Sequence, residues 1–233
     1  MFNVVILTVK SELSQEDFDT LLPLVSPEKL EQLKRFCLTR DIQNSLLGDI
    51  LTRMEICRVI GLSNEQLVFC TGPLGKPFLV NDLHLHFSIS HAGDYTACAV
   101  ADKPVGIDIE LIRNVDLRIA ERLCTLDEMD YIMEGPQMQR FYEVWTKKEC
   151  RIKWEGKGLH KPLPSFSVFN RFEPKQPVYH EVFNNGEALC YVCSAKQDTP
   201  SVRIINTDML MNTVLSGSHQ YKNHEAHKMN LIA

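Results

Sequence analysis

Apolar and polar residues follow recognisable strand and helix periods in the first part of the chain. The apolar run from Phe2 to Val9 is typical of a strand. Ser26 and Pro27 predict a helix start, because a serine side chain accepts hydrogen bonds from free amide groups and proline fits the first helical turn. A longer helical pattern runs from Leu46 to Ile60, and Gly61 is predicted to end it. This region therefore predicts a strand followed by helices.

The pattern changes to strands after a loop rich in glycine and proline at residues 72–77. Apolar segments predict strands at 83–90, 95–101 and 105–110, with a hairpin turn at 91–94. Helical spacing predicts helices at 116–123, at 127–133 and around Trp145, the last of which should stop at Gly156 or Gly158. The segments expected as later antiparallel strands are 166–169, 177–182, 189–194 and 202–205.

Three carboxylates fall on predicted surfaces that could face one another. Alternate side chains of a strand share a face, so Asp108 and Glu110 in the sequence VGIDIE project together. In a helix Trp145, Glu149 and Lys153 form one stripe, because they are four residues apart. Each group alone is explained by an exposed strand end or by a helical ion pair. Together they predict a magnesium site that faces a phosphate, since magnesium prefers hard oxygen ligands and shares itself with substrate phosphates.

Two other segments have both a plain and a functional interpretation. Gly75, Lys76 and Pro77 could form a turn with a solvated lysine, or a clamp on a nucleotide made by backbone and ammonium groups. Ser90 and His91, at the end of a predicted strand, could bond within a turn, or could offer a hydroxyl and an imidazole to a phosphate or ribose. The residues alone leave both alternatives open.

Several other chemistries find little support. His84, His86 and His91 have no cysteine or carboxylate at ligand spacing, which disfavours zinc. No serine lies in the G-x-S-x-G motif of a serine hydrolase. The eight cysteines are scattered, and Cys190 and Cys193 lie in a predicted strand that turns their side chains to opposite faces. We therefore expect free thiols in a reducing compartment.

Composition and charge limit the possible partners. The net charge of −5 argues against broad binding to nucleic acid or to an anionic membrane. Neither a signal pattern nor a run of about 18 apolar residues occurs, so we expect a cytoplasmic protein. Any affinity for phosphate must come from a local basic cluster. The densest one consists of Lys147, Lys148, Arg151, Lys153, Lys157 and Lys161.

Four motifs give the chain a resemblance to the 4′-phosphopantetheinyl transferases of the larger, surfactin-synthetase type. They are GKPFL at 75–79, FSISH at 87–91, VGIDIE at 105–110 and WTKKECRIKWEGKGL at 145–159. The last two are the most specific, and the similarity extends to about residue 210. The resemblance implies an α/β (α+β) fold of two similar halves related by a pseudo-twofold axis. The expected parts are an N-terminal half at 1–104, a half with the metal site at 105–210 and a weakly ordered tail at 217–233.

This resemblance implies transfer of the 4′-phosphopantetheine arm of coenzyme A to a serine of a carrier protein, with release of adenosine 3′,5′-bisphosphate. Asp108, Glu110 and Glu149 would then hold magnesium and Lys153 would meet the pyrophosphate. The proton of the serine could pass to Glu128, to Glu149 or to a metal-bound water, since Glu128 stands where the family has a proposed base. The residues expected to contact coenzyme A are Lys29, Asn44, Gly75, Lys76, Pro77, Ser90, His91, Asp108 and Lys153.

One position departs from the family pattern. Relatives often have an arginine in the helix before LLGD, where this chain has Asn44. An arginine fork would bind the 3′-phosphate of coenzyme A, whereas an amide supplies no charge. Either Lys29, Arg40 or Lys76 replaces that arginine, or the affinity for coenzyme A is reduced.

The expected partners are coenzyme A and apo carrier domains of peptide, polyketide or fatty acid synthases, including those of antibiotic biosynthesis. We expect a monomer that steers these acidic domains with the basic residues between Lys147 and Lys161. Two other classes stay open. A magnesium-dependent phosphohydrolase could use the same carboxylates, and an inactive carrier-binding module is mildly favoured by Asn44.

Overall fold

A four-stranded sheet forms the centre of the first half of the molecule. The computed structural model describes residues 1–156, 158, 161–170, 176–195 and 199–216. The sheet has the order β4-β5-β1-β9 and contains β1 (Phe2–Thr8), β4 (His86–Ala92), β5 (Tyr95–Ala101) and β9 (Ser201–Asn206). Strand β5 is antiparallel to β1 and β4, whereas β9 runs parallel to β1. A separate ribbon pairs β2 (Phe69–Thr71) with β3 (Pro77–Leu79).

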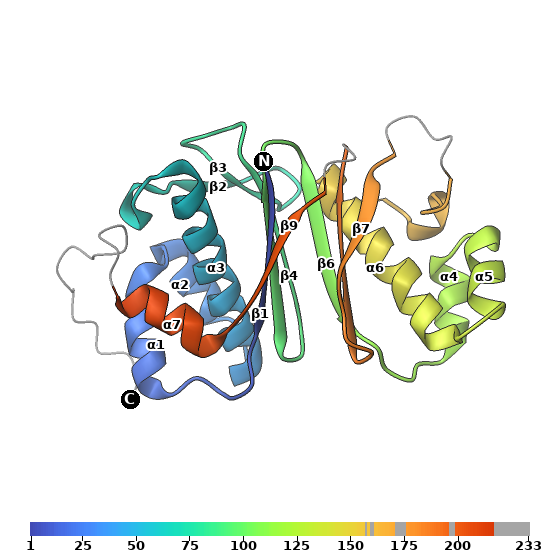
Figure 1. Cartoon of the computed structure of the whole chain (residues 1–233), viewed down its shortest axis with the longest axis horizontal. Helices are drawn as coiled ribbons and strands as arrows, with labels where there is room; N and C mark the ends of the chain where they lie inside the picture. The colour runs from blue at the N-terminus through green and yellow to red at the C-terminus, as the bar shows by residue number, and fades with distance from the viewer. Residues whose placement is uncertain (157, 159–160, 171–175, 196–198, 217–233) are drawn as a thin grey trace.

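Helices cover one face of this sheet (Figure 1). They are α1 (Gln15–Leu21), α2 (Pro27–Leu33), α3 (Thr39–Ile60) and α7 (Thr207–Leu215). The side chain of Ser26 accepts a hydrogen bond from the Lys29 amide, which confirms the predicted start of α2. Gly61 ends α3 as predicted, with a φ of 71° that glycine adopts without steric cost. The helices and the sheet enclose one apolar core between them.

The second half repeats the combination of a long helix and an antiparallel sheet. Its sheet has the order β6-β8-β7, with β6 (Val105–Leu111), β7 (Val178–Asn184) and β8 (Ala188–Ser194). Its helices are α4 (Ala120–Leu123), α5 (Leu126–Met133) and α6 (Gln137–Glu155). Gly156, the first of the two glycines predicted to end α6, does so with a φ of 67°. None of the described helices has the length and apolar character needed to cross a membrane.

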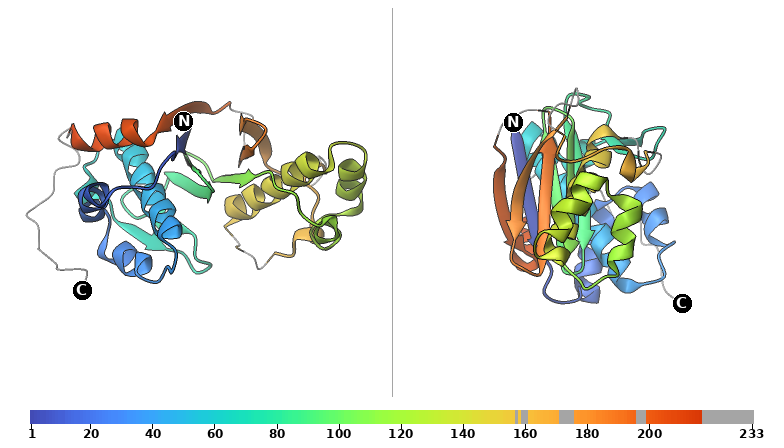
Figure 2. Two further views of the ribbon diagram at one scale, coloured as in Figure 1. Left: turned by 90° about the horizontal axis from the view of Figure 1, so that it is seen from below. Right: turned by 90° about the vertical axis from the view of Figure 1, so that its right-hand side faces the viewer.

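The two sheets pack against each other, with one layer of helices on each outer side (Figures 1 and 2). Val4 and Ile6 from β1 share a core with Ile107 and Val192 from the second sheet. Strand β4 also lies beside β6, and the Ile107 amide donates a hydrogen bond of 3.1 Å to Ser88 Oγ. These contacts bring FSISH and VGIDIE, which are separate motifs in the sequence, side by side.

Gly106 allows α6 to approach β6 closely. A Cβ atom at this position would clash with the carbonyl oxygen of Cys150 and would lie 2.6 Å from the Trp154 amide nitrogen. Only a residue without a side chain leaves room for the helix backbone here. The glycine in VGIDIE therefore determines how near the helix with Glu149 and Lys153 lies to the strand with Asp108.

The structure differs from the sequence-based predictions in several elements. Helices α1 and α7 were not predicted, and residues 166–169 form irregular chain instead of a strand. Residues 202–205 do form a strand, but it is parallel to β1 and not antiparallel. Residues 201–210 therefore lie with the N-terminal half, although the predicted boundary assigned them to the second one. The predicted tail at 217–233 lies outside the described residues.

The cysteines follow the prediction of free thiols. All eight are unbridged, and six of them are buried. Cys190 packs into the core between the sheets, whereas Cys193 packs into the core beneath α6. The two thiols therefore point to opposite faces of β8, as their odd spacing predicts.

Candidate active site

Asp108 lies where the two halves meet, and only 3% of it is exposed. Its Oδ1 accepts one hydrogen bond of 2.7 Å from Ser90 Oγ, on β4 of the first half. The same oxygen is 2.7 Å from Lys153 Nζ, on α6 of the second half. Its Oδ2 is buried and has no hydrogen-bond partner among the described residues. One carboxylate oxygen is thus fixed by the protein, while the other is left for a ligand.

Glu110 and Glu149 contribute further negative charge around Asp108. Trp145 Nε1 donates a hydrogen bond of 2.9 Å to Glu110 Oε1. Burial, together with the charge of Asp108, raises the pKa of Glu110 to about 7. Burial and Asp108 also raise the pKa of Glu149, whereas Lys153 lowers it. Burial is the main cause of both shifts, and the charge of Asp108 adds to each of them.

Lys153 partly balances this negative charge. Burial opposes the charge on its ammonium, but attraction to Asp108 outweighs burial, and the pKa of Lys153 lies above its ordinary value. The side chain remains 29% exposed. A cation that is held by a carboxylate and still reaches solvent can meet an anionic substrate at the same point.

The donor set suits magnesium chemically, although the side chains do not form a ready three-ligand cluster. Among the residues described, no group of three His, Cys, Asp or Glu side chains is arranged to hold a metal. The carboxylates instead pair with Lys153 and Trp145. Nevertheless, three hard oxygen donors gather here, and Asp108 Oδ2 is buried without a partner. The residues present fit a magnesium ion, and the metal site stays a prediction.

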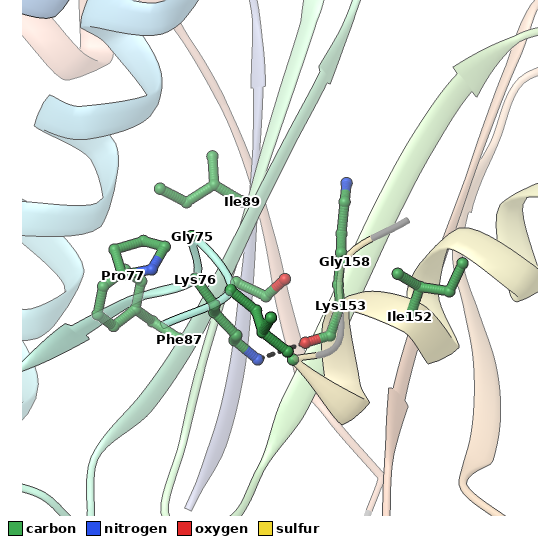
Figure 3. A pocket seen from close by; sticks show the side chains of 11 residues that line it. Gly75, Lys76, Pro77, Phe87, Ile89, Ile152, Lys153 and Gly158 are labelled. Carbon is green, nitrogen blue, oxygen red and sulfur yellow. Dashed lines mark hydrogen bonds between the residues drawn. The ribbon is translucent and has the colours of Figure 1, made fainter. Parts of the chain in front are cut away.

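Two cavities adjoin the site. The first has a volume of about 290 Å³ and lies between the 72–77 loop and the end of α6 (Figure 3). A larger one, of about 770 Å³, lies over α2 and α3. Both are lined by Gly75, Pro77, Phe87 and Ile89, so they adjoin along the same wall. The cationic side chains in these walls are Lys76 and Lys153 in the first cavity and Lys29, Arg35 and Arg53 in the second.

Asn44 does not line either cavity. Only 4% of it is exposed, and its Nδ2 donates to the Gly93 carbonyl oxygen at 3.2 Å. Lys29, in contrast, lines the larger cavity, and its Nζ is 2.8 Å from Ser45 Oγ. Among the predicted replacements for the missing arginine, Arg40 pairs with Asp94. Of the three predicted replacements, Lys29 lines the larger cavity, Lys76 lines the smaller one and Arg40 lines neither, and the role of each stays a prediction.

His91 and Ser90 do not act as one pair. Strand alternation turns Ser90 towards β6, where it bonds to Asp108, and turns His91 to the opposite face. His91 is solvent-exposed. Of these two side chains, only the Ser90 hydroxyl lies at the carboxylate site, where it donates its hydrogen bond to Asp108.

The position of Glu128 contradicts its predicted role as a base. The residue is fully buried, and its Oε2 lies 2.7 Å from Lys148 Nζ. The same oxygen accepts a bond from the Thr125 amide, and Oε1 accepts one from the Val168 amide. Both oxygens are occupied and none of the side chain reaches solvent, so no substrate hydroxyl can contact it. Glu128 holds α5 against α6 instead.

The predicted basic patch is not a solvated surface. Lys148 is fully buried, and Arg151 is buried and paired with Glu155. Glu155 also pairs with Lys161, while the Lys147 ammonium lies 4.6 Å from the centre of the Tyr191 ring. Lys157 lies outside the described residues. Among the described residues of the patch, Lys147, Lys148, Arg151 and Lys161 thus contact groups of the second half.

Some residues around the site were not predicted to take part in it. Arg35 and Arg53 line the larger cavity, and Arg53 also pairs with Asp49. Trp145 was placed on the correct helix face, but its hydrogen bond to Glu110 was not expected. Helical spacing shows which face these side chains occupy. It does not show which strand or cavity that face meets.

Comparison with known proteins identifies the class of enzyme that this fold and site belong to. Residues 12–103 match the family described as "4'-phosphopantetheinyl transferase, N-terminal". Residues 104–207 match the "4'-phosphopantetheinyl transferase superfamily". The chain therefore belongs to the 4′-phosphopantetheinyl transferase family, which confirms the resemblance seen in the motifs. Its α/β fold agrees with that assignment.

Individual relatives support the same assignment. The chain is 31% identical to the 4′-phosphopantetheinyl transferase gsp of Aneurinibacillus migulanus over 237 residues, which cover 96% of this chain and 99% of that one. It is 40% identical to the 4′-phosphopantetheinyl transferase Sfp of Bacillus subtilis (strain 168) over 159 residues, covering 67% and 71% of the two chains. The protein is thus an enzyme of the surfactin-synthetase type of 4′-phosphopantetheinyl transferase. Enzymes of this family transfer phosphopantetheine from coenzyme A to carrier proteins.

Proposed function

We propose that this enzyme transfers the 4′-phosphopantetheine arm to carrier domains of peptide, polyketide or fatty acid synthases in a magnesium-dependent reaction that releases adenosine 3′,5′-bisphosphate. The observation that carries the proposal is the position of Asp108. It is held by Ser90 from one half and by Lys153 from the other, next to a pair of adjoining cavities with cationic walls. We further propose that the enzyme is cytoplasmic and monomeric.

The adjoining cavities are suited to an extended anionic ligand. In the larger one, Lys29, Arg35 and Arg53 supply charge for the phosphorylated ribose of coenzyme A. In the smaller one, Phe87, Ile89 and Ile152 offer apolar contacts for less polar parts of the ligand. Lys153 lines the wall of the smaller cavity and also reaches Asp108. The pyrophosphate would therefore lie between the two cavities, beside the carboxylates.

Magnesium would be held by Asp108, Glu110 and Glu149. Of their oxygens, Asp108 Oδ2 is buried and has no hydrogen-bond partner among the described residues, so it is the atom that most requires a cation. When bound, the ion supplies positive charge that stabilises the pyrophosphate during displacement. Ser90 and Trp145 orient two of these carboxylates, at Asp108 Oδ1 and Glu110 Oε1. The protein thus contributes oriented ligands and does not need to form a covalent intermediate.

The reaction itself is a displacement at phosphorus. The carrier serine oxygen bonds to the phosphorus nearest the pantetheine arm, and the bond from that phosphorus to the bridging oxygen breaks. The bridging oxygen leaves with the nucleotide, and Lys153 stabilises the charge that grows on the phosphates. The hydroxyl proton goes to Glu149, because Glu128 is buried in an ion pair and Glu149 remains half-buried beside the site.

Carrier domains need a docking surface, and the described cations between Lys147 and Lys161 are mostly engaged within the second half. The chain directly after β6 carries the exposed side chains of Arg113, Arg118 and Arg122. It begins next to Glu110, so a carrier docked there would have its serine near the carboxylates. Attraction between these arginines and an acidic carrier would favour encounter at low salt.

Intact-mass measurement of several apo carrier domains tests the proposal. After incubation with the enzyme, coenzyme A and magnesium, at least one domain should gain one phosphopantetheine, and adenosine 3′,5′-bisphosphate should accumulate in equal amount. Chelation with EDTA should stop the gain. Release of inorganic phosphate from simple esters would instead support the phosphohydrolase. Binding of carriers without any mass gain would support the inactive module.

A further inference from the structure

Lys76 joins the two halves of the molecule. It lies in the loop between β2 and β3, in the first half. Its Nζ donates to the backbone oxygen of Val105 at 3.0 Å. It also donates to the backbone oxygen of Lys153 at 2.5 Å, the bond drawn as a dashed line in Figure 3. Val105 begins β6 and Lys153 lies in the last turn of α6. One ammonium group thus contacts the starting point of the strand that carries Asp108 and the helix turn that carries Lys153.

Both acceptors have a physical need for such a donor. The last carbonyl groups of a helix have no partner within that helix, and a cation there also balances the negative end of the helix dipole. Lys153 belongs to the last turn of α6, where Gly156 satisfies only the Ile152 carbonyl. Strand β6 is at the edge of its sheet, so part of its backbone is not paired by a neighbouring strand. Among the described residues, Lys76 supplies a hydrogen-bond donor to both of these carbonyl groups.

Burial of the Lys76 ammonium costs free energy, because the charged group loses contact with water. The pKa of Lys76 is lowered to about 8, mainly by burial and also by the nearby charge of Lys153, whereas Cys193 raises it. A lysine with only a solvent-facing role would turn its ammonium to water. The two carbonyl bonds compensate for the lost hydration. In the protein without ligand, the ammonium already has protein partners.

We propose that Lys76 is a positioning residue that fastens the 72–77 loop to the end of α6. Gly75 and Pro77, on either side of it, line both cavities. The bond to the Lys153 backbone then sets where that loop stands relative to the Lys153 ammonium and Asp108. The expected effect of Lys76 on the reaction rests on the proposed function, whereas its bonds to the Val105 and Lys153 backbone do not. The competing role for Lys76 is a direct bond to a phosphate of coenzyme A.

Hydrogen exchange of the ligand-free protein separates these two roles. In Lys76→Met, backbone exchange should rise about tenfold in two segments, 72–79 and 152–156, because both lose a shared contact. The matched control is Lys103→Met, since Lys103 is an exposed lysine before β6 and has none of these contacts. It should leave both segments unchanged. Unchanged exchange in Lys76→Met would overturn the proposal, because a residue that contacts only substrate has no effect before substrate binds.

Steady-state kinetics test the consequence for the reaction. Lys76→Met should raise the KM for coenzyme A about tenfold and should also lower kcat, while the KM for the carrier stays near that of the parent. A rise in KM with unchanged kcat would assign Lys76 to substrate binding alone and would overturn its positioning role. If the methionine variant does not fold, Lys76→Gln keeps an amide donor and serves in both measurements. If the parent enzyme has no transfer activity, the proposed function is wrong. The hydrogen-exchange experiment still tests the positioning role of Lys76 in that case.

Discussion

Ser90 Oγ donates a hydrogen bond of 2.7 Å to Asp108 Oδ1, so a residue of the first half orients a carboxylate of the second. The same oxygen is bound by Lys153, whereas Oδ2 has no partner among the described residues. This asymmetry assigns different tasks to the two oxygens of one side chain. Oδ1 fixes the direction of the carboxylate, and Oδ2 is the atom available to a cation.

Asp108→Asn should reduce transfer by at least about a hundredfold, because it removes the charge while keeping the shape of the side chain. The folded state should persist, since Asp108 lies at a polar junction and its loss also relieves repulsion on Glu110 and Glu149. Mass assays and thermal unfolding check the two statements. Asp130→Asn, at an exposed position on α5, is the matched control and should leave both unchanged. Normal turnover of Asp108→Asn in magnesium would remove the basis for this site.

Lys153→Met should lower kcat by about two powers of ten, because the ammonium stabilises charge that grows on the phosphates during the reaction. The affinity for magnesium, measured by calorimetry, should fall much less or should rise, since a cation that competes for Asp108 is removed. Equal kinetics in variant and parent would show that the lysine only neutralises the carboxylate.

Lys29→Met should weaken the binding of coenzyme A by about 1.5 to 3 kcal/mol, the range for hydrogen bonds to charged groups. Binding of 3′-dephospho-coenzyme A should change little if Lys29 serves the 3′-phosphate. Michaelis constants for both substrates check this, with Arg40→Met as the control because Arg40 pairs with exposed Asp94. Equal weakening towards both substrates would place Lys29 at another phosphate.

Asn44→Arg should destabilise the protein and should not improve the affinity for coenzyme A. The side chain is buried and bonds to the Gly93 carbonyl oxygen, so a larger arginine would lose this bond and overfill the space. Unfolding in urea should show a loss of about 1 to 3 kcal/mol. A lower Michaelis constant for coenzyme A in a stable variant would mean that the helix can turn this position towards the ligand.

Glu128→Gln should lower the free energy of unfolding by about 3 to 5 kcal/mol, because it leaves Lys148 charged and unpaired in the core. Turnover of the folded fraction should stay close to that of the parent at low temperature, since Glu128 does not reach substrate. Adding Lys148→Met should recover part of the stability, and the double-mutant cycle measures their coupling. A catalytic base would show the opposite, with lost turnover and unchanged unfolding.

Strand and helix periods were sufficient to predict the central part of the site. The alternation in VGIDIE and the four-residue spacing of Trp145, Glu149 and Lys153 depend only on local geometry, and the structure brings those faces together. Gly106 could be recognised as unusual in the strand, but the closeness of α6 to it could not. Local patterns therefore predicted which side chains share a face, and they also predicted the start of α2 and the C-terminal end of α3.

Predictions that depended on distant contacts were less successful. The basic residues of α6 looked like a solvated patch, yet Lys148 finds Glu128 from another helix. Glu128 looked like a candidate base, because its burial is not visible in the sequence. Lys76 was expected to bind substrate, and its bonds to two backbone carbonyls leave no trace in residue spacing. In each case the charge has a partner far away along the chain, which residue spacing does not show. The contact of Lys76 with coenzyme A stays a prediction.

The parallel pairing of β9 with β1 has a consequence for how the chain assembles. Val4 lies opposite Val202, so the sheet of the first half is complete only when a segment from beyond the second half has been made. Leu210 and Val214 then close its apolar core. Residues 1–104 expressed alone would expose the unpaired edge of β1, and exposed strand edges promote aggregation. During synthesis on the ribosome, the first half cannot complete its sheet until the second half and β9 have been made. Its folding therefore finishes after the second half has been synthesised.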